Sequence, residues 1–268
     1  MIVKTPAKIN LGLHIKSKRP DGFHEIESIF YPIPLFDFVE LISAEKDSFN
    51  SYGIEIPGNK EDNLCIKALK LLRNKGFDVS PYEIHLLKNI PIGAGLGGGS
   101  SNAVAVLKAV NVLENLNLST EKLMELAAEL GSDCPFFCLP NAALVTGRGE
   151  HIKPIDFSLK DSYIHLVYPN LHISSGEAYG AIDLSKTHSS PISIPEEKKG
   201  FQRNFINDFQ APLEGDFPVL QRIKDAFTNS GAYFSSLSGS GSSMFGLFKE
   251  EPQKLFRQEN WKEWILRL

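Results

Sequence analysis

The sequence has few of the features that mark secreted, membrane-spanning or nucleic-acid-binding proteins. Its 268 residues include only three cysteines, which cannot all pair with one another, so no disulfide framework is indicated. The 28 lysines and arginines are outnumbered by 32 aspartates and glutamates, and the resulting net charge of -4 argues against a surface for polyanions. We therefore expect a protein of a reducing compartment that binds no nucleic acid.

Long hydrophobic runs are also missing. Residues 1–12 lack the extended apolar core of a signal peptide. The uncharged stretch 89–107 contains five glycines followed by Ser-Ser-Asn, which makes it too polar and too flexible to cross a bilayer. These absences predict a cytoplasmic protein without a membrane partner.

What is present is an ordinary globular composition, 42% hydrophobic and 22% charged, in a chain long enough for one or two domains with a sizeable core. Residue patterns predict strands over 2–15, 23–31, 38–42, 82–90, 163–168 and 244–248, with a hairpin over 142–156. They predict helices over 63–75, 103–116, 120–130, 202–209 and 218–229, and loop over 185–200.

A glycine-rich loop, PIGAGLGGGSS, occupies residues 91–101 and leads into a predicted helix. Glycine allows the backbone N–H groups to approach an anion closely, and a helix N-terminus adds partial positive charge. Five glycines within residues 93–99, followed by two serines, exceed what a flexible lead-in to a helix needs. The pattern therefore favours a phosphate site, formed by Pro91, Ile92, Gly93, Ala94, Gly95, Leu96, Gly97, Gly98, Gly99, Ser100 and Ser101.

Two common phosphate motifs do not fit this loop. A Walker loop requires a lysine after its last glycine, and none follows here. A dinucleotide fingerprint matches formally at Gly93, Gly95 and Gly98, with Glu114 downstream. That fingerprint needs a strand after the helix, whereas a second helix is predicted here, so it is excluded by its context.

Three segments resemble, in the right order, the three motifs of the GHMP kinases. They are 6-PAKINLGLHI-15, the glycine loop itself and 237-LSGSGSSMFGLF-248. The resemblance implies an α+β fold of two lobes with the active site between them. It also implies an N-terminal nucleotide-binding and catalytic domain over 1–155 and a C-terminal domain over 156–268. In the third motif, Ser238, Gly239, Ser240 and Gly241 would line the nucleotide phosphates, although alone they read as a turn before a strand.

Two further segments, 19-RPDGFHEIES-28 and 131-GSDCPFF-137, resemble one branch of these kinases. That branch phosphorylates the 2-hydroxyl of a cytidine-diphosphate conjugate of 2-C-methyl-D-erythritol in the non-mevalonate route to isoprenoid precursors. The resemblance implies that the substrates are small molecules, with ATP and Mg²⁺ as cofactors. Two rival functions are a kinase for another acceptor, such as mevalonate or homoserine, and a nucleotide-binding regulator without catalysis.

By resemblance, Asp133 is the general base and Lys8 lies beside it, where its cation would favour the developing alkoxide. Each residue has a simpler interpretation. Asp133 precedes a proline and an apolar turn, as a helix N-cap does. Lys8 could be a solvated charge on one face of the first strand.

The same resemblance assigns the acceptor side of the site. Asn10 would orient the substrate or support Lys8, His24 would bond the edge of the cytosine, and Phe23 and Tyr179 would stack on its faces. Phe23 replaces a frequent tyrosine of the family, so it could stack but could not donate a hydrogen bond. A surface histidine and a core tyrosine are the simpler interpretations of His24 and Tyr179. The pair Cys134 and Cys138 is interpreted as two small hydrophobes, with no metal ligand assigned.

Overall fold

The computed structural model describes residues 1–257 and 259–268, which divide into two compact units. Unit 1 contains Met1–Lys8, Leu35–Ile92 and Gly97–Pro140. Unit 2 contains Ile9–Pro34, Gly93–Leu96 and Asn141–Leu268. The chain therefore passes between the units several times, and strands β1 (Ile2–Lys18) and β2 (His24–Ser43) contribute to both. The sequence-based boundary at residue 155 stays a prediction.

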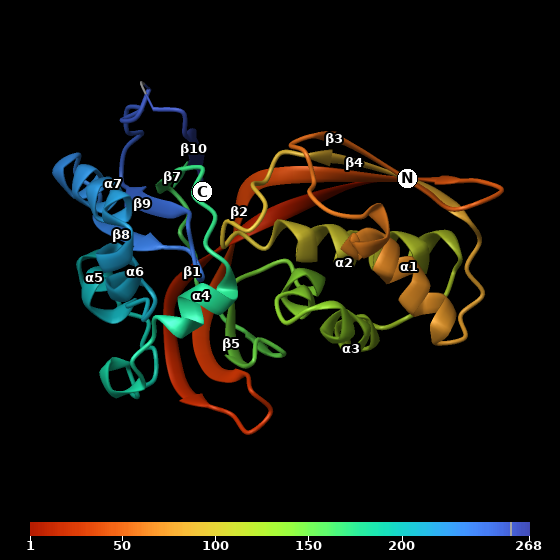
Figure 1. Ribbon diagram of the computed structural model, residues 1–268, viewed down its shortest axis with the longest axis horizontal. Helices are drawn as coiled ribbons and strands as arrows, with labels where there is room; N and C mark the ends of the chain where they lie inside the picture. Colours follow the sequence, from red (N-terminus) through yellow and green to blue (C-terminus); the bar gives the residue numbers. More distant parts are fainter. Residues whose placement is uncertain (258) are drawn as a thin grey trace. The chain divides into compact units, whose positions relative to one another are not determined.

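Unit 1 is a sheet covered by helices. Its strands β3 (Ser48–Gly53), β4 (Tyr82–Lys88) and the end of β2 pair in that order, β3 parallel and β2 antiparallel to β4. Helices α1 (Leu64–Asn74), α2 (Gly98–Leu113) and α3 (Thr120–Leu130) pack against one another on one side of these strands (Figure 1). Two 3-10 turns, η1 (Lys60–Asp62) and η2 (Cys134–Cys138), precede α1 and follow α3.

Unit 2 contains two groups of strands. The start of β2 pairs antiparallel with β5 (Ala143–Gly147), which pairs with β6 (His151–Pro154). A separate antiparallel sheet has the order β10 (Lys262–Arg267), β7 (Tyr163–Tyr168), β9 (Met244–Phe248), β8 (Phe234–Leu237).

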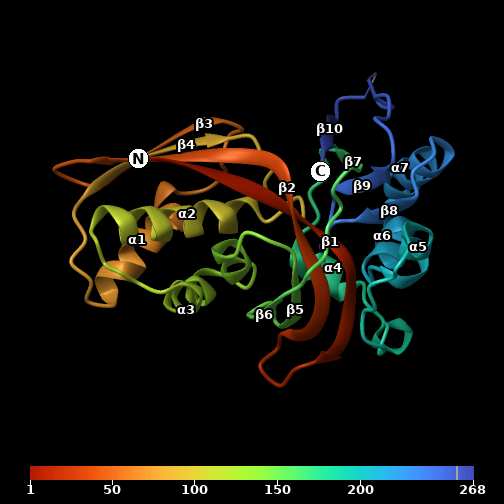
Figure 2. The ribbon, with the colours of Figure 1, turned by 180° about the vertical axis from the view of Figure 1, so that it is seen from behind.

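Helices cover one side of that second sheet. They are α5 (Phe201–Asn204), α6 (Gln210–Asp216) and α7 (Pro218–Asn229), seen from behind in Figure 2. Helix α4 (Ser175–Gly180) is short and begins with a full capping box between Ser174 and Glu177. Two 3-10 turns, η3 (Leu184–Lys186) and η4 (Lys198–Gly200), flank a stretch without regular structure, as expected for the predicted loop over 185–200.

The α+β class is confirmed, as are most elements with strong periodicity. The strands at 163–168 and 244–248 and the helix at 218–229 have the predicted bounds. Helices α1 and α3 begin after Asn63 and Ser119, whose side chains accept the capping hydrogen bonds. The order β4, α2, α3 confirms that the unit is not a dinucleotide-binding βαβ.

The prediction of two separate strands over 23–31 and 38–42 is wrong, because β2 runs unbroken through Pro32 and Pro34. Residues 26–30 of β2 pair with β5, and residues 38–43 pair with β4. The two prolines fall between these ladders, where no partner on that side requires their missing N–H groups.

The predicted helix over 202–209 is confirmed only at its start, where α5 (Phe201–Asn204) ends before residue 205. Leu13 donates its N–H to the carbonyl of Ile206 at 2.8 Å, and Asp208 donates to the carbonyl of Leu13 at 2.9 Å. Pairing with β1 therefore interrupts the helical periodicity and separates α5 from α6. Among residues 1–257 and 259–268, no helix is both long and apolar enough to cross a membrane.

Candidate active site

The glycine loop ends at a helix start that no side chain caps. Helix α2 begins at Gly98, five residues earlier than predicted, so Gly98 to Ser101 form its first turn. Its N-cap Gly97 has φ +67°, and no side chain caps the helix. The first turn also contains no acidic residue. Its backbone N–H groups and partial positive charge therefore suit an anion.

Lys8 and Asp133 meet beside this helix start, all within unit 1. Lys8 Nζ lies 3.4 Å from Asp133 Oδ2. A Cβ added at Gly97 would come within 3.1 Å of Lys8 Cγ and 2.8 Å of the Phe137 ring, so only glycine leaves room for this approach. The predicted base and the predicted neighbouring cation thus lie together against the end of the glycine loop.

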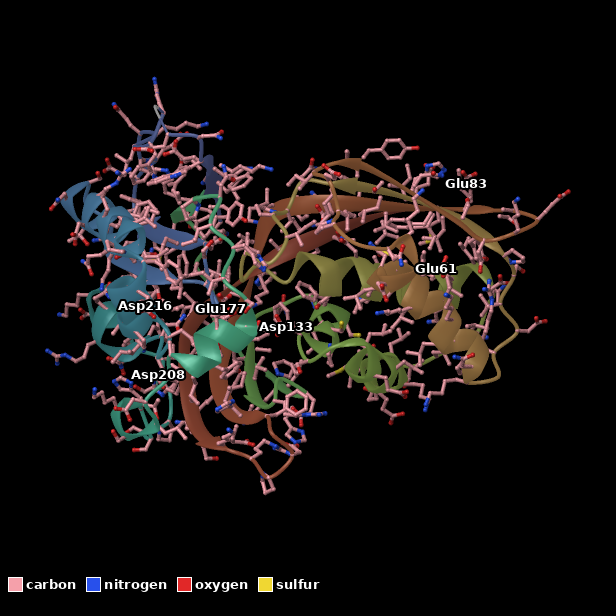
Figure 3. The ribbon with its side chains drawn as sticks, in the orientation of Figure 1. Glu61, Glu83, Asp133, Glu177, Asp208 and Asp216 are labelled. Atoms are coloured by element: carbon pink, nitrogen blue, oxygen red, sulfur yellow. The ribbon has the colours of Figure 1, made fainter. Side chains whose placement is uncertain are left out.

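Burial decides between the interpretations of these two residues. The Lys8 side chain is 3% exposed, so it is not a solvated charge on a strand face. Asp133 occupies the N-cap position of η2, but its side chain makes no capping hydrogen bond. The carboxylate, labelled in Figure 3, remains 33% exposed beside the buried ammonium group. The pairing therefore leaves part of the Asp133 carboxylate open to solvent.

The first part of the glycine loop contacts the third motif within unit 2. Ser238 Oγ donates to the carbonyl of Gly95 at 2.9 Å, and Ser243 donates its N–H to the carbonyl of Ala94 at 3.2 Å. A Cβ at Gly95 would lie 1.9 Å from the Ser238 carbonyl oxygen. Both glycine-rich segments are therefore packed backbone to backbone, at a spacing that admits no side chain.

Sequence reasoning did not single out Asn207, which holds the third motif, and it assigned Asn10 to the substrate or to Lys8. Asn207 donates to the carbonyls of Leu237 and Gly239, both at 2.9 Å. Asn10 donates to Ser28 Oγ at 2.9 Å, and its Oδ1 would lie 3.3 Å from a Cβ at Gly239. A lone asparagine in a predicted helix gave no signal of this role, since its partners lie about thirty residues away.

Of the predicted acceptor residues in unit 2, His24 and Tyr179 contact each other, whereas Phe23 contacts a different side chain. The rings of His24 and Tyr179 stack at 4.4 Å between centroids and 11° between planes, and Tyr179 meets Phe209 edge to face. Burial, with a smaller effect of Lys18, lowers the pKa of His24, so its neutral form dominates at neutral pH. Phe23 is 51% exposed and lies under the guanidinium of Arg148 at 4.9 Å. The guanidinium of Arg148 therefore packs on the Phe23 ring.

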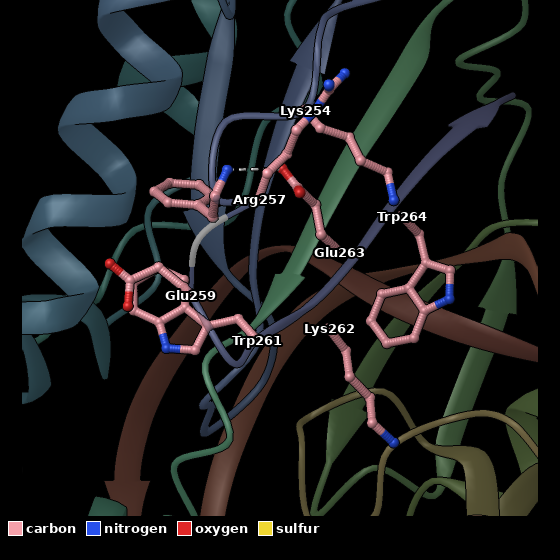
Figure 4. Close-up of a pocket in the computed structure, with 8 residues that line it drawn as sticks. Lys254, Arg257, Glu259, Trp261, Lys262, Glu263 and Trp264 are labelled. Atoms are coloured by element: carbon pink, nitrogen blue, oxygen red, sulfur yellow. Dashed lines mark hydrogen bonds between the residues drawn. The ribbon is translucent and has the colours of Figure 1, made fainter.

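No cluster of three or more His, Cys, Asp or Glu side chains suited to a metal occurs in residues 1–257 and 259–268. Burial raises the pKa of Cys134 to about 12 and of Cys138 to about 11, so both thiols stay protonated at neutral pH. A hollow of about 550 Å³ in unit 2, lined by Trp261, Trp264 and neighbouring charged residues, is shown in Figure 4. None of its lining residues belongs to the predicted site.

Comparisons with known proteins define the class. The family model described as "GHMP kinases N terminal domain" matches residues 63–141, and that described as "GHMP kinases C terminal" matches residues 198–264. A crystal structure of a mevalonate kinase from Methanococcus jannaschii has the same fold, with a TM-score of 0.72 at 17% identity over 100% of this chain and 98% of that one. The fold and both models are therefore those of GHMP kinases.

Similarity over the full length is more specific. The 4-diphosphocytidyl-2-C-methyl-D-erythritol kinase of Parabacteroides distasonis is 43% identical over 93% of this chain and 92% of its own. That of Cytophaga hutchinsonii is 39% identical over 94% of both chains. A crystal structure of 4-(cytidine 5'-diphospho)-2C-methyl-D-erythritol kinase has a TM-score of 0.78 at 30% identity, covering 92% of this chain and 90% of that one. The chain therefore belongs to the family of 4-diphosphocytidyl-2-C-methyl-D-erythritol kinases, which are ATP-dependent enzymes.

Proposed function

We propose that the protein transfers the γ-phosphoryl group of ATP to the 2-hydroxyl of 4-diphosphocytidyl-2-C-methyl-D-erythritol. The observation that carries this proposal is the buried Lys8 paired with the accessible carboxylate of Asp133 beside the uncapped start of α2. Family membership supports the substrate, because the relatives of similar length bear its name.

Phosphoryl transfer needs little covalent chemistry from the protein itself. Phosphoryl transfer depends mainly on placing the acceptor in line and stabilising charge. A tertiary hydroxyl is a poor nucleophile, so Asp133 takes its proton as the oxygen attacks, and the nearby ammonium of Lys8 stabilises the charge that develops. The first turn of α2 and the loop 238–241 bind the nucleotide phosphates.

Recognition of the acceptor is assigned to unit 2. Neutral His24 hydrogen bonds the edge of the cytosine, while Tyr179 and Phe23 supply stacking surfaces. Asn10, held by Ser28, orients the substrate. These roles rest on the family resemblance of the RPDGFHE segment and on the proximity of His24 to Tyr179.

Mg²⁺ is proposed as a companion of ATP. Magnesium in kinases is commonly held by one or two carboxylates together with substrate phosphates. The hydroxyl of Ser100, in the uncapped first turn of α2, would supply such an ion with one oxygen ligand beside the ATP phosphates. When bound, the ion would neutralise phosphate charge.

The test is an assay of the purified protein with Mg²⁺-ATP and 4-diphosphocytidyl-2-C-methyl-D-erythritol, followed by mass spectrometry. We expect ADP and a product with one extra phosphate. Asp133→Asn should lower kcat by about 10²- to 10⁴-fold while nucleotide affinity stays within about twofold. Asp78→Asn, an exposed aspartate of unit 1, is the matched control and should keep full activity.

Three results would contradict the proposal. Faster transfer to mevalonate or homoserine would assign another acceptor. Nucleotide binding without transfer to any acceptor would indicate a regulator. Normal kcat in Asp133→Asn would remove its role as the base.

A further inference from the structure

Unit 1 contains a second, more deeply buried ion pair that the proposed chemistry does not use. Lys88 Nζ lies 2.5 Å from Asp37 Oδ2, and the two side chains are 3% and 0% exposed. Taking both charges out of water costs several kcal/mol per ion, so such a pair contributes little to stability unless its remaining hydrogen bonds are satisfied. The groups that satisfy them indicate what the pair does.

The pair holds the residues that lead into the glycine loop. Asp37 Oδ1 accepts the backbone N–H of Asn89 at 2.6 Å and that of Ile90 at 2.8 Å. Lys88 Nζ donates to the carbonyl of Ile90 at 2.6 Å. Three backbone groups immediately before residue 91 are therefore bonded to two charged side chains.

The same pair also contacts the end of the loop. A Cβ added at Gly98, the first residue of α2, would lie 2.9 Å from Lys88 Nζ. Asn102, one turn further along α2, donates to Asp37 Oδ2 at 3.0 Å and to Thr5 Oγ1 at 2.9 Å. The segments on both sides of residues 91–97 are thus fixed to one buried carboxylate and one buried ammonium group.

We propose that Asp37 and Lys88 are positioning residues that set the geometry of the phosphate-binding loop for the nucleotide. The inference rests on the proposed function of that loop. The pair acts through the backbone of Asn89 and Ile90 and through the first turn of α2, without touching the nucleotide. An apolar pair of similar volume would fill the space but leave these N–H and carbonyl groups unbonded, so side chains that hydrogen bond are required here.

The experiment compares Lys88→Met and Asp37→Asn with the control Arg73→Met. Arg73 pairs with Asp47 in the same unit and bonds the carbonyls of Val79 and Ser80, away from the glycine loop. Affinity for Mg²⁺-ADP is measured by calorimetry, and KM is measured for ATP and for the cytidine acceptor. The loop variants should weaken Mg²⁺-ADP binding and raise the KM for ATP by about tenfold or more, with the acceptor KM within about twofold. Arg73→Met should keep all three values within about twofold.

The outcomes separate this inference from the proposed function. Absence of Mg²⁺-ADP binding by the wild-type protein would contradict the proposed function itself. If the wild-type protein binds Mg²⁺-ADP and both Lys88→Met and Asp37→Asn bind it with the same affinity, the inference is overturned. Equal increases in the KM for ATP and the KM for the acceptor would also overturn it, because they indicate general damage to the fold. If these two variants do not fold, the KM for ATP of Asn102→Ala tests the inference instead, because that variant leaves the ion pair in place. A selective rise in the KM for ATP of about threefold supports the inference, and unchanged kinetics overturn it.

Discussion

Replacing Gly95 by alanine should damage both stability and nucleotide binding, because two separate features of the structure exclude a side chain there. Gly95 has φ +76°, a left-handed conformation that costs an L-residue about 1–2 kcal/mol. The added Cβ would also lie 1.9 Å from the Ser238 carbonyl oxygen and 3.2 Å from that of Gly241. Forcing extra volume into packed backbone costs about 1–3 kcal/mol more.

These two terms together predict a loss of about 2–5 kcal/mol in the free energy of unfolding. For a chain of this size about 1 kcal/mol corresponds to about 2–4 °C in melting temperature, so a decrease of about 4–20 °C is expected. Gly231→Ala is the matched control in unit 2. Its φ is +89°, but nothing lies within 4 Å of its added Cβ, so it should lose only the conformational part, about 1–2 kcal/mol.

The assay combines scanning calorimetry with the KM for ATP. Because the clash can be relieved only by moving the turn 238–241 or the glycine loop, Gly95→Ala should raise the KM for ATP, whereas Gly231→Ala should not. The reasoning is refuted if the melting temperature falls by the same amount in both variants, or if Gly95→Ala keeps the wild-type KM for ATP.

Lys8→Met should lower kcat by about 10²- to 10³-fold in steady-state kinetics. The control Lys46→Met, which replaces an exposed lysine, should keep its kcat. An unchanged kcat in Lys8→Met would show that Lys8 does not stabilise the developing charge. His24→Ala should raise the KM for the cytidine acceptor about fivefold with kcat unchanged, and a loss confined to kcat would contradict base recognition. Burial lowers the pKa of His14 below its usual 6.5, so below pH 6.5 the unfolded chain binds more protons than the folded one and stability falls. Thermal melts from pH 7 to 5 should show this decline, and His14→Asn, which cannot titrate, should reduce its slope; an identical slope would refute the assignment.

The sequence predicted local structure well where periodicity and capping residues agree. Helix α3 illustrates this, because Ser119 caps it, apolar residues follow at helical spacing and Gly131 ends it. The position of the glycine loop before a helix was also predictable, since so many glycines and serines within residues 93–101 are typical of a phosphate-binding loop at a helix N-terminus. The bounds of α2 were misplaced, because it begins five residues before the predicted 103, among glycines that are poor indicators of helix, and ends three residues before the predicted 116.

Contacts between distant residues could not be predicted in this way. The segment 206–208 has helical periodicity, but two hydrogen bonds to Leu13 align it with β1, and tertiary pairing overrides local propensity. The strand β2 continues through Pro32 because the two neighbouring ladders end on either side of it. None of these partners is visible in the local pattern, since β1 and β5 lie more than a hundred residues away in sequence from the segments they pair with and β4 lies about forty to fifty residues away.

The interpretation of Lys8 shows where the structure adds most to the candidate site. Unit 1 contains two lysine–aspartate pairs whose lysines are equally buried, each 3% exposed. The aspartates differ, because Asp133 is 33% exposed whereas Asp37 is fully buried and already accepts hydrogen bonds from Asn89, Ile90 and Asn102. A base must reach the hydroxyl from which it takes a proton, and a carboxylate with its acceptor positions occupied cannot. Accessibility of the aspartate, rather than burial of the lysine, is therefore the observation that supports our proposals of Asp133 as the base and of Asp37 as a positioning residue.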